Sequence, residues 1–584
     1  MNIFEKIENI VEQTLQEMPF WYENENLPPV KIKLEVPRDK THGDLSSNIA
    51  MILAKTIGKT PKDLATEICC HLTGAELIQS ATVAGPGFVN LRLKANVWFE
   101  CVKCILQLGK DFGSSDFGKN ESINIEYVSA NPTGPLHAAH ARGAVVGDTL
   151  ARLLKKVGFR VCKEYYVNDA GTQVDILAKS THLRYLEALG HEIGPIPDGL
   201  YPGEYLREVG MALVKKHGAT WVAAPEEEWL PVIRDFTTQW LMGSIKLDLS
   251  NLGIVMDEYI SEQSLVATGE VDNAMNLLKE KKLIYEGVLQ RPKGKQSDDW
   301  EPRPQLLFKS TNFGDDVDRA IQKSDGSWTY FASDVAYHIN KIERGYLKMI
   351  DVWGADHGGY VRRMQAAVNA ASDHEANLDI KICQIVHLLK NGNPFRMSKR
   401  AGTFITLEDV LKAVGKDVIR FMMLTRRNDQ VLEFDFDTVV AQSRDNPVFY
   451  VQYAHARCCS VMRHASKMFG NKRLTSDLLS CVDLEKLRDE AEMDVIKELA
   501  SWPRIIEGAA QAHEPHRIAF FLTDLAGAFH SLWNKGKDHS ELRFIVEDDE
   551  ELTLARLALI QSIILVLASG LELMGIEPIQ EMKS

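Results

Sequence analysis

The sequence predicts an α/β protein with a central domain on a parallel sheet, an N-terminal α+β domain and a C-terminal all-α bundle. Residues 122–128 and 161–167 are rich in β-forming apolar residues, and the segment between them repeats apolar residues at helical spacing. Strand, helix and strand in this order indicate a crossover between parallel strands. The first 112 residues mix helix and strand patterns, whereas the chain beyond about residue 415 is almost wholly helical in pattern. A chain of 584 residues is long enough for several domains.

The composition is that of an ordinary globular protein, with 45% hydrophobic and 25% charged residues. The formal net charge of -14 argues against a general cationic coat for nucleic acid, although a local basic stripe would suffice for binding. Nine cysteines, an odd count without regular spacing, indicate a reducing compartment. The N-terminal residues have the pattern of an amphipathic helix rather than a secretory signal, and the apolar run 557–570 is too short to span a bilayer. We therefore expect a cytoplasmic protein without membrane contact.

Residues 1–112 are expected to form a separate domain. An N-terminal helix is followed by a strand over 31–36, a polar turn and a helix that begins near Asp44. A glycine-proline turn joins two further strand patterns, 81–84 and 88–93. The pair Cys101 and Cys104 lies in a helical pattern without a second CxxC, so we interpret it as a buried helix face and predict no metal site.

The central helix opens at the motif HAAH, which spans His137 to His140. The loop before it, 129–136, holds two prolines and a glycine, and Gly158 stands where the helix is expected to end. Open parallel sheets bind ligands at the C-terminal ends of their strands, where a helix N-terminus presents N–H groups and a positive dipole to phosphate. The two imidazoles add donors one turn apart. A zinc-protease helix would need a glutamate after the first histidine, where this chain has alanine.

A second motif lies about 260 residues later, in NGNPFRMSKRAGTFITLEDVL. Its basic loop carries Arg396 and Lys399, and it follows an expected strand over 382–388. Thr406 and Asp409 have the spacing of a capping box, which predicts that a helix begins there. A basic loop beside the same strand ends can close on a triphosphate that the HAAH helix holds from the other side.

Together these motifs resemble the paired signatures of class I aminoacyl-tRNA synthetases, and the whole chain is similar to arginyl-tRNA synthetases of bacterial type. The resemblance is carried by EVPRDKTHGDLSSNIAM, IEYVSANPTGPLHAAH, YYVNDAGTQ, AIQKSDGSWTYFASDVAYH, WGADHGGYVRRMQAA, RMSKRAGTFITL and NPVFYVQYAHAR, in the family's order. It implies a Rossmann-like catalytic domain over 113–415 with a helical insertion at about 180–250. It also implies that domain 1–112 contacts tRNA and that the helical domain 416–584 binds the anticodon.

The resemblance implies an activity and its partners. The expected enzyme is an ATP-dependent ligase that joins L-arginine to tRNA(Arg) in two steps, through arginyl-adenylate, and releases AMP and pyrophosphate. Mg²⁺ is expected on the phosphates of ATP, and the protein is expected to be a monomer. Arginine activation should also require tRNA.

The resemblance also assigns site residues to this sequence. The residues implied to be catalytic are His137, His140 and Lys399. Those implied to bind ATP are the same three with Arg396, Met397 and Ser398. Those implied to bind arginine are Glu126, Ser129, Asn131, Glu262, Tyr330, Asp334 and His357, with Glu126 and Asn131 around the α-amino group.

Two of these assignments have plain structural alternatives. A guanidinium is planar and presents five donors, so a selective pocket requires a carboxylate in its plane and further acceptors. Asp334, four residues after Tyr330, fits this requirement, although spacing alone favours an aspartate that caps a helix. Glu126 ends a central strand, where a buried carboxylate needs a partner, and pairing with a lysine is the alternative to a contact with substrate.

Two departures from the family's usual signatures concern ATP. The first motif usually has glycine at its third position, where adenine packs on bare backbone, and this chain has Ala139. The second motif usually begins with lysine, where this chain has Arg396. A binding protein without catalysis would suit both departures, but the joint presence of the catalytic and arginine residues argues against it. A cysteinyl enzyme would require a thiolate zinc site, which the cysteine spacing does not offer.

Overall fold

The computed structural model describes residues 2–23, 27, 31–37, 39–289, 304–323, 325–395, 405–441, 446–470 and 474–582. At its centre is a parallel sheet of five strands in the order β11-β10-β4-β5-β6. The strands are β4 (Ser122–Tyr127), β5 (Arg160–Val167), β6 (Glu258–Ser261), β10 (Lys348–Gly354) and β11 (Asn377–Cys383). From β4 the chain builds the sheet first toward β6 and later, on the other side, toward β11. The order therefore reverses between β4 and β10, which is where ligands bind in such sheets.

Helix α6 (Ala138–Lys156) connects β4 to β5 and covers one face of the sheet, as the sequence predicted. Its buried side includes Val145, Val146 and Leu150, which the helical spacing had placed on one face. The helix lies very close to β4, since a Cβ added at Gly147 would stand 2.3 Å from Tyr127 Cγ. The close contact fixes the helix, and with it the HAAH turn, against the strand end.

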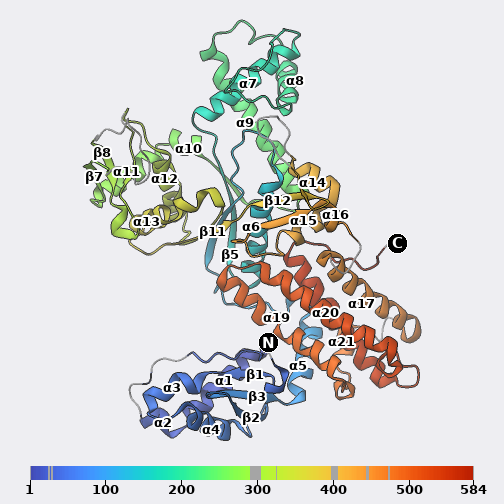
Figure 1. The fold of residues 1–584 in the computed structure, drawn as a ribbon. Helices are drawn as coiled ribbons and strands as arrows, with labels where there is room; N and C mark the ends of the chain where they lie inside the picture. Colours follow the sequence, from blue (N-terminus) through green and yellow to red (C-terminus); the bar gives the residue numbers. More distant parts are fainter. Residues whose placement is uncertain are drawn as a thin grey trace.

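Two excursions leave the sheet on different sides (Figure 1). Between β5 and β6 the chain forms α7 (Thr172–Ala188), α8 (Tyr205–His217) and α9 (Glu226–Asn251), so the segment expected to be helical is helical. Between β6 and β10 it forms α10 (Glu262–Ala267), α11 (Glu270–Glu280), β7 (Ile284–Gly287), β8 (Gln305–Phe308), β9 (Arg319–Ala320) and α12 (Tyr330–Glu343). Side chains of α12 reach the face of the sheet opposite α6.

The strand expected over 382–388 is two strands in different sheets. The first part belongs to β11, and the second part begins β12 (Val386–Lys390). β12 pairs with β13 (Asn393–Pro394) and, in parallel, with β14 (Leu432–Asp435). The apolar pattern was continuous across the break because residues of both strands are buried. Residues beyond 415 are therefore not wholly helical.

The N-terminal region contains an antiparallel sheet in the order β1-β3-β2, packed with α1 (Ile3–Gln16), α3 (Ile49–Ile57) and α4 (Pro61–Leu72). The strands β2 (Ile78–Ala84) and β3 (Phe88–Leu93) are joined as predicted. Two other predictions were wrong. The segment 31–36 contributes only a bridge from Glu35 to Ser46, and Asp44 precedes the short strand β1 (Leu45–Ser47) rather than a helix. The side chain of Asp44 accepts from Leu93 N instead, which ties the turn to β3.

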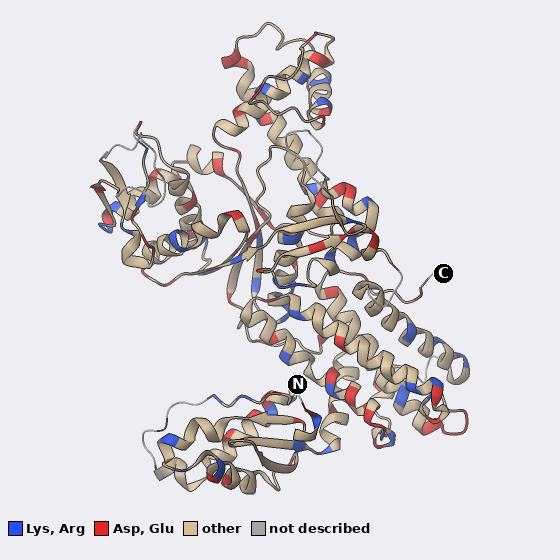
Figure 2. Ribbon diagram, viewed as in Figure 1, with Lys and Arg blue, Asp and Glu red and all other residues tan. Residues whose placement is uncertain are grey.

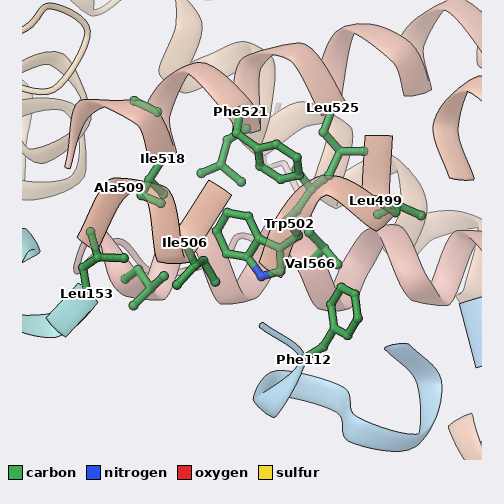
Figure 3. Close-up of a cluster of buried hydrophobic side chains, with 14 of the residues drawn as sticks. Phe112, Leu153, Leu499, Trp502, Ile506, Ala509, Ile518, Phe521, Leu525 and Val566 are labelled. Atoms are coloured by element: carbon green, nitrogen blue, oxygen red, sulfur yellow. The ribbon is translucent and has the colours of Figure 1, made fainter. Parts of the chain in front are cut away.

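The C-terminal bundle is formed by α17 (Pro447–Phe469), α19 (Glu490–Ala512), α20 (His516–Asp538) and α21 (Glu550–Leu573). Helix α5 (Ala95–Leu108), which carries Cys101 and Cys104, packs against α19 and α21. Trp502 lies at the centre of the bundle core and stacks on Phe521 at 4.8 Å between ring centroids. Figure 3 shows Leu153 of α6 and Phe112 in the same cluster. Helix α6 and the bundle thus share one core.

Helix α21 is longer than the apolar run suggested. It is the one helix in the described part of the chain whose length and composition would allow it to cross a membrane. However, 72% of its most apolar window is buried inside the protein, as in a core helix. Lys, Arg, Asp and Glu are interspersed over all regions (Figure 2), so the negative net charge is not confined to one of them.

Candidate active site

The loop that follows β4 has strained backbone at the point where the strand order reverses. Val128 has φ +72° and Ser129 has φ +36°, although neither is glycine. A β-branched residue in this region is an outlier that costs free energy, and such strain concentrates at functional sites. Surrounding groups hold the loop in place. Tyr165 donates to the carbonyl of Ala130 at 2.7 Å, and Tyr205 of α8 donates to that of Thr133 at 2.5 Å.

The two histidines of the HAAH motif lie together at the N-terminus of α6. His137 is the N-cap residue, and its ring stacks on that of His140 at 3.8 Å between centroids. The backbone N–H of His137 donates to Nδ1 of His140 at 3.2 Å. A neutral His140 ring therefore carries its proton on Nε2, which becomes the donor. Both rings and the positive end of the helix dipole are suited to phosphate.

The segment that follows the second motif pairs with the segment that precedes α6. Arg396, Met397, Ser398 and Lys399 lie outside the described residues, but the chain on their C-terminal side does not. Ala138 N donates to Ile405 O at 3.2 Å, and Leu407 N donates to Leu136 O at 2.7 Å. These two hydrogen bonds pair the segment that leaves the basic loop with the segment that enters α6. The Thr406–Asp409 capping box is confirmed at the start of α14 (Leu407–Val414).

Arg142 of α6 connects the helix of the HAAH motif with the segments that precede β12 and β14. Its side chain is buried, and it donates to the backbone carbonyls of Gln384 at 3.0 Å, Arg427 at 2.7 Å and Gln430 at 2.6 Å. These carbonyls flank β12 and β14. Burial of a guanidinium is costly unless its donors are satisfied, and these three hydrogen bonds from Nη1 and Nη2 offset part of that cost. They fix the HAAH helix relative to the small sheet that leads to the basic loop.

Carboxylates gather on the other side of the β4 end, around Tyr166 of β5. Burial, and then the neighbouring Asp334 and Asp169, raise the pKa of Glu262 to about 7. Burial raises the pKa of Asp334 to about 6, although Tyr360 donates to its Oδ2 at 2.6 Å and opposes the rise. Burial and the same carboxylates also raise the pKa of the Tyr166 hydroxyl.

This carboxylate cluster contains more negative charge than its own partners compensate. Within the described residues, neither Glu262 nor Asp334 forms a salt bridge with a lysine or arginine. Raised carboxyl pKa values beside one another are typical of a site that awaits a cation. A guanidinium with five donors is a suitable occupant.

The remaining residues predicted to bind arginine lie in α12, in the loop after β4 and in the turn after β10. Tyr330 and Asp334 are one turn apart in α12, as the spacing predicted, with Tyr330 exposed at the first helical position. Asn131 is exposed in the loop and donates to Gln173 at 3.2 Å. His357 is exposed in the 3₁₀ turn η4 (Ala355–Tyr360) and packs edge-on to Trp353.

Glu126 has the lysine partner that the sequence left open as an alternative. It is buried, accepts from Lys341 Nζ at 2.7 Å, and accepts from Ser129 Oγ at 2.9 Å. The carboxylate therefore joins the sheet interior to the loop rather than standing alone at the strand end.

Sequence reasoning missed Lys341 and Arg142, and it quoted Tyr166 and Tyr360 only within motifs. Lys341 and Arg142 have ordinary residue types in helix patterns, so nothing local marks them. The two tyrosines had a weak signal, since Tyr166 shortly precedes Asn168 and Asp169 at the end of a strand and Tyr360 directly follows two glycines.

Comparison with known proteins supplies the family. The chain is 53% identical over 588 residues to the arginine–tRNA ligase of Parvibaculum lavamentivorans, with 100% of both chains covered. The chain belongs to the arginyl-tRNA synthetase family. It is equally 53% identical over 584 residues to the arginine–tRNA ligase of Roseobacter denitrificans, again with 100% of both chains covered.

Family models and solved structures agree with this assignment. Residues 5–93 match the arginyl tRNA synthetase N terminal domain, residues 102–193 the class I (R) tRNA synthetase catalytic domain, and residues 451–582 the DALR anticodon binding domain. An arginyl-tRNA synthetase structure from Campylobacter jejuni matches with TM-score 0.72 and 34% identity, over 84% of this chain and 100% of that one. The Thermus thermophilus enzyme matches with TM-score 0.74 over 99% of this chain and 100% of that one, and at 22% identity it supports the fold alone.

Proposed function

We propose that the protein ligates L-arginine to tRNA(Arg) at the expense of ATP. The arginine carboxylate attacks the α-phosphate of ATP and gives arginyl-adenylate and pyrophosphate. A hydroxyl of the 3′-terminal ribose of tRNA, the 2′-OH in class I enzymes, then takes the arginyl group and releases AMP. The observation that carries the proposal is the cluster of Glu262 and Asp334 beside the N-terminus of α6. Among the described residues, neither carboxyl forms a salt bridge with a lysine or arginine.

Arginine is held at both of its ends in this proposal. Glu262, Tyr330 and Asp334 receive the guanidinium, and a pocket that satisfies all five donors rejects analogues that leave its carboxylates unpaired. Glu126, Ser129 and Asn131 receive the α-amino group at the end of β4. His357 contacts the substrate from the loop after β10. Citrulline and lysine should therefore be poor substrates.

ATP is held between the two motifs. His137 and His140 donate to the phosphates from the N-terminus of α6, while Arg396, Met397, Ser398 and Lys399 close from the second motif. Mg²⁺ bound to ATP would neutralise part of the charge on its phosphates. The protein supplies little covalent chemistry. It positions the two substrates in line and stabilises the charge on the reacting phosphate, with His137, His140 and Lys399 as catalytic residues.

The other regions carry tRNA. We propose that residues 1–112 contact the body of tRNA(Arg), that 113–415 form the catalytic domain with the helical insertion at about 180–250, and that 416–584 bind the anticodon. In the bundle, Arg457 lies 4.0 Å from the ring centroid of Tyr453 and 4.9 Å from that of Trp533. Aromatic and cationic side chains of this kind suit unstacked bases. The proposed enzyme is a cytoplasmic monomer, and tRNA is required for arginine activation.

The test is arginine-dependent exchange between ATP and pyrophosphate, measured with and without tRNA from the same source. We expect exchange only when arginine and tRNA are both present. Exchange with another amino acid would contradict the substrate, and exchange without tRNA would contradict the tRNA requirement alone. No exchange, with tRNA still bound, would support the alternative of a binding protein.

A further inference from the structure

A buried ionic network lies between α12 and the sheet, next to the residues that are proposed to bind arginine. Three adjacent strands contribute carboxylates and α12 contributes cationic groups, and all of them except Arg344 are at most 5% exposed. The members are Glu126 of β4, Glu164 of β5, Asp351 of β10, and His338, Lys341 and Arg344 of α12. The proposed function uses only Glu126 of this network.

Lys341 is at the centre of the half nearest the site. Its Nζ lies 2.7 Å from Glu126 Oε2 and 3.1 Å from Asp351 Oδ1, and its side chain is fully buried. Potential ligand atoms of Glu126, His338 and Asp351 lie within 4.8 Å of one another, an arrangement that suits a metal ion. The lysine ammonium provides the positive charge at this place.

The charges of the network balance. Nδ1 of His338 lies 2.8 Å from the carbonyl of Asp334, and Nε2 lies 2.9 Å from a carboxylate oxygen of Asp351. Both partners are acceptors, so the ring donates from both nitrogens and is an imidazolium. With Lys341 and Arg344 it makes three cations against three carboxylates. Removal of Lys341 would leave Glu126 as a buried carboxylate without its cation, and such a group takes up a proton.

A chain of hydrogen bonds runs from Lys341 to the loop of the site. Glu126 accepts from Lys341 with Oε2 and from Ser129 with Oε1. Ser129 Oγ in turn accepts from the backbone N–H of Tyr166 at 3.1 Å. This fixes the orientation of two groups that are proposed to receive the α-amino group of arginine. The same helix also carries Asp334, which is proposed to receive the guanidinium.

We propose that Lys341 is a positioning residue for the α-amino group of arginine, acting through Glu126 and Ser129. This inference rests on the proposed function. Burial raises the pKa of the Glu126 carboxyl, whereas the Lys341 ammonium lowers it and, with Ser129, holds the group aimed at the loop, so that it can accept from an ammonium group. Helix α12 thereby sets the distance between the two ends of the arginine site.

The test uses two analogues as inhibitors of arginine-dependent ATP–pyrophosphate exchange. Agmatine keeps the amine and lacks the carboxylate, whereas argininic acid has a hydroxyl in place of the α-amino group. The ratio of the two inhibition constants measures recognition of the amine. In Lys341→Met we expect the argininic acid to agmatine ratio to fall by about 10- to 100-fold, because a charged hydrogen bond to the amine is lost. The KM for ATP should stay unchanged.

Arg344→Gln is the matched control. Arg344 lies one turn beyond Lys341 in α12 and pairs with Glu164 at 2.7 Å, and among the described residues no hydrogen bond or salt bridge joins Arg344 to Glu126. We expect this variant to be less stable but to keep the wild-type ratio. A ratio that falls equally in both variants would overturn the inference, because it would show general damage to α12. An unchanged ratio in Lys341→Met would overturn it as well.

A double variant decides the matter if Lys341→Met alone does not fold. Glu126→Gln/Lys341→Met leaves no unpaired carboxylate at this place, and it is compared with Glu126→Gln. Because Lys341 acts through Glu126, the two should have the same ratio and the same KM for arginine within about threefold. A further loss of tenfold or more in the double variant would contradict the inference. Failure of wild-type exchange would instead contradict the proposed function.

Discussion

The two sides of the β4 strand end have opposite chemistry. On one side α6 presents two stacked histidines and a helix N-terminus, which favour anions. On the other side Glu262 and Asp334 lie beside Tyr166 without a lysine or arginine salt bridge within the described residues, which favours a cation. Only the loop from Val128 to Leu136 separates the two sides. A polyanion and a cationic amino acid can thus be held close enough to react, because each is bound by groups that would repel the other.

We expect the largest loss of activity when a negative charge that is proposed to bind the guanidinium is removed. Asp334→Asn keeps the shape of the side chain and loses its charge, so the guanidinium would face an amide that offers it donors. We expect kcat/KM for arginine to fall by about 10³-fold, with the KM for ATP unchanged. Steady-state exchange kinetics measure both values. Asp325→Asn, at an exposed position in the segment before α12, is the control and should be neutral. Equal losses for arginine and ATP would show that Asp334 is structural.

The next largest effect is expected when a donor to the phosphates of ATP is removed. Lys399→Ala should lower the rate of adenylate formation by about 10²- to 10³-fold, which is the usual effect of losing one donor to a charge that develops in the transition state. The affinity for arginine should change little. Single-turnover measurements separate the rate from the affinity, and Lys390→Ala in β12 serves as the control. A rate within threefold of wild type would contradict the catalytic role.

A fall in pH should weaken the binding of arginine more than the binding of ATP. Glu262 and Asp334 have folded pKa values of about 7 and about 6, raised from 4.5 and 3.8. Below these values the carboxyls are protonated, and a guanidinium cannot displace the protons without cost. The KM for arginine should therefore rise roughly tenfold from about pH 8 to about pH 6, while the KM for ATP changes less.

The same shifts determine how the free protein responds to pH. A carboxyl whose folded pKa is raised is more easily ionised in the unfolded chain, so these two groups destabilise the free protein as pH rises toward 8. Bound arginine should offset this loss, and thermal unfolding with and without arginine measures it. Glu262→Gln should flatten the pH dependence of the KM for arginine. A dependence that persists unchanged in this variant would assign it to another group.

We expect the smallest effect from a substitution in the first turn of α6, where ATP is proposed to bind. Ala139 is half-buried in the first turn of α6, where glycine is usual in the family. Ala139→Gly should lower the KM for ATP by about two- to threefold, if removal of the methyl group allows adenine to approach the backbone. It should also destabilise the helix by about 0.5–1 kcal/mol. Exchange kinetics and thermal unfolding measure the two effects, and an unchanged KM would show that the methyl group does not contact ATP.

Some of this protein follows from local sequence. The period of apolar residues predicted β4, α6 and β5, and the Thr406–Asp409 spacing predicted the start of α14, because each depends on residues only a few positions apart. Long motifs in a fixed order also indicated the family. Local patterns failed where burial hid a break, as in the strand expected over 382–388, and where a polar side chain served a turn, as at Asp44.

Only the tertiary structure decided how the site is supported. Lys341 pairs with Glu126 across 215 positions of sequence, and Arg142 reaches carbonyls between 242 and 288 positions away. A lysine or arginine in a helix pattern has no local feature that distinguishes a solvated charge from a buried one. The difference arises when strands and helices pack, because only then is the charge removed from water and required to find a partner. Local sequence was enough to propose the reacting residues, whereas the charges beneath them were found only from the packing of strands and helices.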